Sequence, residues 1–149
     1  MSKISIRLTK NLIVEIIRYL EQNVTDLAET RILDLIKSTD LDEQSTNHCK
    51  PNPPPKHQSI QNALSSIISE DLLPIKKCIS LCMSHLMWDS DAGEFYERNS
   101  GISSDYVNGN MNTELIGPNR GVFRNKQLRL GLFLLDPHIF YEDHKHAAP

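Results

Sequence analysis

The sequence predicts an α+β fold in which a helical N-terminal half caps a small β-body. Two observations carry this prediction. Apolar residues recur at helical spacing up to about residue 88, on both sides of a proline-rich stretch. The period then changes, because leucines alternate with other residues from 128 to 134, as in a strand with one buried face.

Residues 1–37 are predicted to form a helical hairpin that turns near Asn23. Each of its two helices carries one apolar stripe. The stripe residues are Leu12, Ile13, Ile16, Ile17 and Leu20 in the first helix, and Leu27, Ile32, Leu35 and Ile36 in the second. Thr25 is the expected N-cap of the second helix, because its hydroxyl can accept a hydrogen bond from a free backbone N–H.

Residues 38–58 are predicted to be a polar, proline-rich linker. They include Pro51 and the run Pro53–Pro55. Proline removes backbone donors and favours extended conformations, so we expect a spacer and not a buried element. A polyproline ligand for another domain is the alternative interpretation of this run.

Residues 59–109 are predicted to be a helical region that ends in an aromatic loop. Helix resumes at Ser59, and a further helix over 71–88 has Pro74 in its first turn, where proline is tolerated. Cys78 and Cys82 share one face of that helix, either as buried small hydrophobes or as a pair of metal ligands. His85 lies beside the apolar stripe and is expected to pack in the core.

The segment from 89 to 109 predicts an irregular loop, since acidic, glycine and serine residues interrupt the helical pattern. The aromatic residues in and beside it are Trp88, Phe95, Tyr96 and Tyr106. They either pack the loop onto the body of the protein or line a pocket.

Residues 110–149 are expected to contain the strands. Gly117-Pro118 and Asp136-Pro137 are turn pairs, and the alternating leucines predict a strand between them. A second short strand is predicted from His138 to Tyr141.

His144 and His146 stand two residues apart directly after that predicted strand. Residues at this spacing point to the same side of a strand, so both imidazoles can bind one metal ion. From the residues alone, a solvated histidine-rich tail remains an equal alternative.

Composition excludes several classes of protein. A net charge of −3 and a pI near 6.0 argue against a nucleic-acid partner. No apolar run reaches the ~20 residues of a membrane helix, and charges at Glu15 and Arg18 exclude a signal peptide, so we expect a cytoplasmic protein without a membrane partner. Three cysteines without CxxC spacing indicate neither a disulfide framework nor a zinc ribbon.

Three segments of the C-terminal part stand out: NTELIGP at 112–118, GLFLLDP at 131–137 and YEDHKHAAP at 141–149. Together they resemble the dimethylsulfoniopropionate (DMSP) lyase family of the cupin superfamily. The family's first cupin motif reads HxHxxxExY, and His144 and His146 match its two histidines. The resemblance therefore implies that the strands begin a cupin barrel.

The resemblance also implies chemistry. His144 and His146 would be ligands of a divalent transition metal, such as Zn, Fe, Ni or Mn, and Tyr141 matches a pocket tyrosine and is the candidate catalytic residue. The substrate would be a small carboxylate with a sulfonium group, cleaved to dimethyl sulfide and acrylate. Aromatic walls at Trp88, Tyr96, Tyr106 and Tyr141 suit a sulfonium cation.

The motif's third ligand and its tyrosine base would fall after Pro149. We therefore expect an incomplete barrel and an inactive fragment. Two alternatives stay open: another metal cupin that acts on a small acid as an isomerase or oxygenase, and a helical interaction module with an unstructured tail. A homodimer that buries the open barrel edge is one oligomeric state that the sequence allows.

Overall fold

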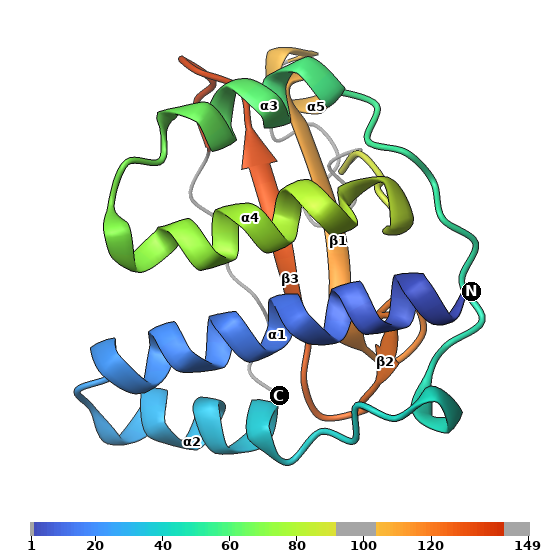
Figure 1. Cartoon of the computed structure of the whole chain (residues 1–149). Helices are drawn as coiled ribbons and strands as arrows, with labels where there is room; N and C mark the ends of the chain where they lie inside the picture. Colours follow the sequence, from blue (N-terminus) through green and yellow to red (C-terminus); the bar gives the residue numbers. More distant parts are fainter. Residues whose placement is uncertain (1, 92–103, 142–149) are drawn as a thin grey trace.

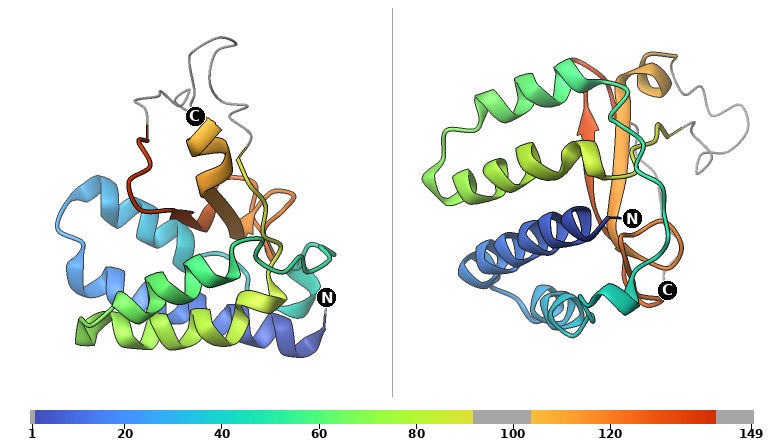
Figure 2. Two further views of the ribbon diagram at one scale, coloured as in Figure 1. Left: turned by 90° about the horizontal axis from the view of Figure 1, so that it is seen from above. Right: turned by 45° about the vertical axis from the view of Figure 1, so that its right-hand side comes forward.

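Helices cover one face of a small three-stranded sheet in the computed structural model (Figures 1 and 2). The structure describes residues 2–91 and 104–141, and His144 and His146 lie outside this range. The predicted α+β class is confirmed. No helix in the described ranges is long and apolar enough to cross a membrane.

The N-terminal hairpin consists of α1 (Lys3–Asn23) and α2 (Leu27–Lys37). The N-cap of α2 is Asp26, whose carboxylate accepts a hydrogen bond from the Glu29 N–H at 2.8 Å, so the prediction of Thr25 is wrong by one residue. A carboxylate at this position also interacts favourably with the positive end of the helix dipole. Thr25 instead donates its backbone N–H to the Glu29 side chain at 3.1 Å.

The second pair of helices is α3 (His57–Ser66) and α4 (Leu73–Cys82), with short 3₁₀ turns at Glu70–Leu72 and Met83–His85. Pro74 lies in the first turn of α4, as predicted. The predicted helix to residue 88 ends earlier, because the backbone from Leu86 to Trp88 is extended and bonds to Asn52. The Asn52 N–H donates to the Leu86 carbonyl at 3.0 Å, and the Trp88 N–H donates to the Asn52 carbonyl at 3.1 Å.

The segment between α2 and α3 is packed onto the sheet, so the spacer interpretation is wrong. It contains a 3₁₀ turn at Glu43–Ser45, followed by Thr46 and Asn47, which are both buried. The Asn47 N–H donates to the Val122 carbonyl at 3.0 Å, and its side-chain amide donates to the Gly121 carbonyl at 2.8 Å. These bonds give partners to polar groups that would otherwise be buried without one.

The short helix α5 (Ser104–Gly109) leads directly into the sheet, which has the strand order β2-β1-β3. The strands are β1 (Asn110–Gly117), β2 (Phe123–Arg124) and β3 (Leu130–Leu135). β3 runs antiparallel to β1 and confirms the strand that the alternating leucines predict. Leu130, Leu132 and Leu134 pack against the core beneath the helices.

The second predicted strand, His138 to Tyr141, does not form. His138 has a left-handed backbone with φ of 66°, and the Ile139 N–H turns back to the Asp136 carbonyl at 3.4 Å. Positive φ interrupts an extended strand, so the chain leaves β3 through a turn.

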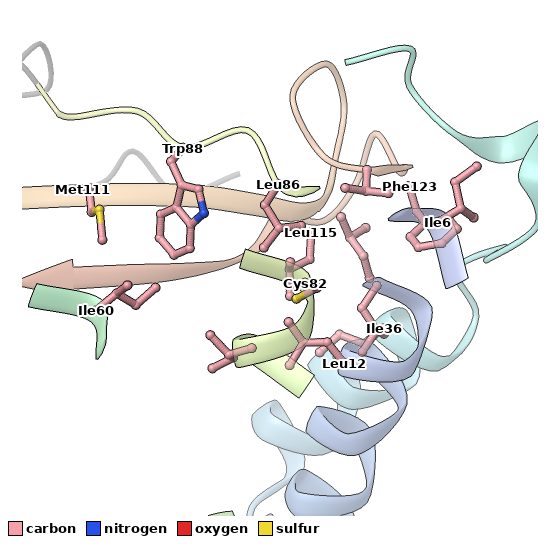
Figure 3. Packing of buried hydrophobic residues seen from close by; sticks show 14 of the residues in the cluster. Ile6, Leu12, Ile36, Ile60, Cys82, Leu86, Trp88, Met111, Leu115 and Phe123 are labelled. Carbon is pink, nitrogen blue, oxygen red and sulfur yellow. The ribbon is translucent and has the colours of Figure 1, made fainter. Parts of the chain in front are cut away.

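The core lies between the helices and the sheet (Figure 3). Trp88, Met111 and Leu115 come from the sheet side, and Leu12 and Cys82 come from the helices; all five are 0–1% exposed. Each fully buried large apolar side chain contributes about 1.5–3 kcal/mol. Burial also raises the pKa of the Cys82 thiol to about 12, which favours the small-hydrophobe interpretation of this cysteine over a metal ligand.

Candidate functional site

The face of the sheet opposite the helices carries the candidate site, and we call it the open face. Strand side chains alternate, so the residues between the core-facing leucines of β3 point to the open face. Phe133 is the largest of them and is 49% exposed. Its cross-strand partner is Asn112 of β1, whose side chain shares the same face.

Three aromatic rings meet at one end of the open face. Tyr141 is 44% exposed, and its ring centroid lies 5.6 Å from that of Phe133 and 5.6 Å from that of Tyr106. The ring planes are inclined by 51° and 35°, respectively. These separations are within the range at which aromatic rings attract one another. Tyr141 and Phe133 therefore present neighbouring aromatic surfaces, with Tyr106 behind Tyr141.

A group of hydrogen bonds fixes Tyr106, and we call it the clasp; its members are Asp91, Tyr106 and Asn110. The Tyr106 hydroxyl donates to Asp91 Oδ2 at 2.7 Å. The Asn110 side chain accepts from the Asp91 N–H at 2.7 Å and donates to the carbonyls of Asp91 at 2.9 Å and Tyr106 at 2.7 Å. Asn110 is fully buried and Tyr106 is 2% exposed, so these two side chains are shielded from water, whereas Asp91 is half-buried.

The turn that carries the chain from β3 to Tyr141 is fixed by two contacts. The Asp136 N–H donates to the Gly109 carbonyl at 2.8 Å, and the Lys56 ammonium donates to Asp136 Oδ2 at 2.8 Å. The hydrogen-bonded Lys56 ammonium lowers the pKa of the Asp136 carboxyl below its usual value. Ile139 packs directly on Gly109, where an added Cβ would lie only 2.7 Å from Ile139 Cγ1. Glycine at 109 therefore allows the turn to approach the end of α5.

Of the described residues proposed to line a pocket, Tyr141 lies exposed at the open face and Tyr106 lies buried behind it. Trp88 does not line a pocket there: it is 1% exposed within the core, and its indole N–H donates to the Met83 carbonyl at 2.8 Å. Phe95 and Tyr96, like the two histidines, lie outside the described residues.

Sequence reasoning missed Phe133 and Asp91. Phe133 could have been predicted from the sequence. It lies between the alternating leucines, and so on the other face of the strand, and it is the one aromatic residue in that strand. No local sequence pattern marks Asp91 as part of the site, because its hydrogen-bond partners lie 15 and 19 positions away in the chain.

The described ranges 2–91 and 104–141 contain no group of three His, Cys, Asp or Glu residues placed to hold a metal ion. His144 and His146, the metal ligands predicted from the sequence, lie outside these ranges. Imidazole nitrogen suits Zn, Fe and Ni in their divalent states.

One family model and one solved structure match this chain. The sequence model of a family described as dimethylsulfoniopropionate lyase matches residues 13–149. No curated protein matches the chain. A solved structure described as "Crystal structures of DMSP lyases RdDddP and RnDddQII" matches with a TM-score of 0.53 and 16% identity. The match covers 87% of this chain and 58% of the solved chain, so the present sequence spans little more than half of that protein's length.

Proposed function

Since the chain belongs to the dimethylsulfoniopropionate lyase family, we propose that it contributes the open-face site of a lyase that cleaves DMSP to dimethyl sulfide and acrylate. The family implies a small-molecule substrate. The structural observation that supports this substrate is the pair of exposed aromatic rings, Tyr141 and Phe133, whose centroids lie 5.6 Å apart. They lie on the open face, opposite the helical layer seen in Figure 2.

The aromatic pair suits the cationic end of the substrate. A sulfonium group carries a positive charge with little capacity for hydrogen bonds, and the faces of aromatic rings attract such cations. The attraction contributes about 0.5–1 kcal/mol at an exposed site and about 2 kcal/mol when the site excludes water. Tyr141 and Phe133 therefore bind and orient the dimethylsulfonium group in the proposed complex.

The reaction is a β-elimination. A base removes the proton on the carbon next to the carboxylate, the electron pair of that C–H bond forms the C=C bond of acrylate, and the C–S electrons leave with dimethyl sulfide. His144 and His146 would hold the divalent metal ion. When bound, such an ion supplies Lewis-acid polarisation of the substrate carboxylate, which acidifies the proton.

In this proposal Tyr141 is in direct contact with the substrate. Its phenol ring faces the sulfonium group, and His144 and His146, which follow it by three and five residues, would hold the metal ion at the carboxylate end of the substrate. Orientation of this kind converts binding energy into a productive geometry for proton removal.

The test is a product assay. The protein encoded by the longest reading frame that contains this chain is supplied with Zn, Fe, Ni or Mn and incubated with DMSP. We expect dimethyl sulfide in the gas phase without oxygen consumption. Oxygen uptake with a small acid, and no dimethyl sulfide, would instead identify an oxygenase and refute the lyase.

A variant pair makes the test specific to the open face. Tyr141→Ala removes one cation-binding ring, so KM for DMSP should rise about 2- to 30-fold, the range that corresponds to one cation–π contact. Tyr19→Phe is the matched control, because Tyr19 lies on α1 in the helical layer. An unchanged KM in Tyr141→Ala would remove Tyr141 from the substrate site.

A further inference from the structure

We propose that Asp91 and Tyr106 are positioning residues, which hold the ring of Tyr141 in the orientation that faces the substrate. The inference rests on the proposed function for the role of Tyr141, but its structural part can be tested separately. It concerns the half-buried carboxylate of Asp91 and the buried phenol of Tyr106, which the reaction itself does not use.

Tyr106 acts from behind Tyr141. It is 2% exposed, so its ring is covered by protein, whereas Tyr141 is 44% exposed. The two ring centroids are 5.6 Å apart with a tilt of 35°. One side of the Tyr141 ring therefore contacts a neighbour whose own position is fixed, and Phe133 supports it from a second direction.

The hydroxyl of Tyr106 determines where that supporting ring lies. A phenylalanine at 106 would fill the same ring volume, but it could not donate to Asp91 Oδ2, a bond of 2.7 Å to a charged acceptor. Hydrogen bonds to ionised groups are about twice as strong as those between neutral groups. The bond thus selects one orientation of the Tyr106 ring among those that the packing volume allows.

Asp91 can serve as this fixed point because Asn110 holds its backbone. The Asn110 amide bonds both the N–H and the carbonyl of Asp91, and its second donor bonds the Tyr106 carbonyl. Asn110 is also the first residue of β1 and pairs with Leu135 of β3. Because Asn110 is part of the sheet, the clasp fixes the Tyr106 ring relative to β1. The Tyr106 ring in turn restricts the ring of Tyr141.

The expected benefit is preorganisation. An exposed side chain that must be ordered on binding reduces affinity by roughly two- to tenfold. Tyr141 follows a turn and not a strand, so the backbone around it does not restrict its ring as a sheet would. Support from Tyr106 supplies part of this restriction before the substrate arrives.

The experiment uses the full chain with ¹³C-labelled tyrosine rings. The chain has four tyrosines, and each ring signal is assigned by its loss in the corresponding Tyr→Phe variant. Because neighbouring rings shift the resonance of an aromatic group, the Tyr141 signal reports its packing against Tyr106. We expect Tyr106→Phe and Asp91→Ala to move the Tyr141 signal toward that of free tyrosine.

Asp91→Asn is the rescue variant, since its amide oxygen can still accept the Tyr106 hydroxyl; we expect its Tyr141 signal to stay near the native position. Tyr19→Phe is the control and should change nothing at Tyr141. The emission of Trp88, the single tryptophan, shows whether each variant keeps its core. If Asp91→Ala fails to fold, Tyr106→Phe and Asp91→Asn still decide the question.

Trimethylsulfonium chloride then serves as the binding probe. The apparent Kd for the probe, read from the Tyr141 signal, should rise about two- to tenfold in Tyr106→Phe and remain near native in Asp91→Asn. A Tyr141 signal that is unchanged in folded Tyr106→Phe would overturn the positioning role. If native protein shows no binding of the probe but Tyr141 still shifts in Tyr106→Phe, the proposed function fails while the positioning role stands.

Discussion

The ion pair between Lys56 and Asp136 provides a quantitative prediction about the turn that carries Tyr141. Their side chains are 25% and 24% exposed, and the ammonium lies 2.8 Å from Asp136 Oδ2. Fully exposed pairs contribute about 0.2–1 kcal/mol, and hydrogen bonds to charged groups contribute about 1.5–3 kcal/mol. For this partly shielded pair we expect about 1–2 kcal/mol of folding stability.

Lys56→Met is the perturbation, because it removes the charge and keeps most of the apolar stem. The free energy of unfolding at pH 7, measured by urea denaturation with circular dichroism, should fall by about 1–2 kcal/mol. Lys77→Met is the matched control, since Lys77 is an exposed lysine on α4 without an ion pair to the residues described in the structure, and it should change stability by less than about 0.5 kcal/mol.

The pH dependence has a defined sign. The hydrogen bond from Lys56 lowers the pKa of Asp136 in the folded protein below its usual 3.8. A carboxyl whose folded pKa is lowered stabilises the protein above the unfolded pKa and loses this effect as the pH falls through the folded value. The difference between native protein and Lys56→Met should therefore be full at pH 7 and shrink below 3.8. A difference that persisted unchanged at lower pH would refute the ion-pair explanation.

Three further predictions concern the core, the turn and the histidines. Trp88→Ala should lower the free energy of unfolding by about 3–5 kcal/mol in a denaturation experiment, because the indole fills the core; a loss below about 1 kcal/mol would contradict its burial. Gly109→Val should displace Ile139 and weaken binding of trimethylsulfonium, measured by calorimetry, whereas unchanged binding would show that the turn tolerates a side chain. His144→Ala combined with His146→Ala should abolish binding of one divalent metal ion per chain, measured by metal analysis after dialysis; retained metal would place the ligands elsewhere.

The periodic parts of the fold were predictable because each depends on local sequence. The leucines of β3 alternate since one face of the strand meets the helices, and the stripe through Leu12 recurs at helical spacing since α1 packs on α4 and the sheet. Such patterns can be recognised in the sequence without knowing which helix or strand the apolar face packs against. Pro74 likewise marks a helix start through its own geometry.

The parts that were not predictable depend on partners far away in the chain. Asn47 is buried because it bonds to Gly121 and Val122, which are more than 70 positions later, and its own neighbourhood reads as a linker. The early end of the helix before Trp88 similarly depends on Asn52. Local propensity cannot anticipate such contacts, because it includes no tertiary interaction.

The candidate site was partly predictable for the same reason. Tyr141 could be identified because it lies in a continuous segment that resembles the family motif, and the structure places it beside Phe133. The clasp behind it brings Asp91 together with Tyr106 and Asn110, which requires the sheet to be in place. A motif that is continuous in sequence therefore identified Tyr141, the ring proposed to face the substrate, but not the residues that support it.

The most direct test of the central claim is the product balance from DMSP. The longest protein whose reading frame contains this chain is supplied with divalent metal, and dimethyl sulfide and acrylate are quantified together. We expect equal amounts of both products, with release lost when His144 and His146 are replaced by alanine. Absence of both products with every metal tested, from a protein that is folded and metal-loaded, would contradict the assignment of a DMSP-cleaving site to the open face.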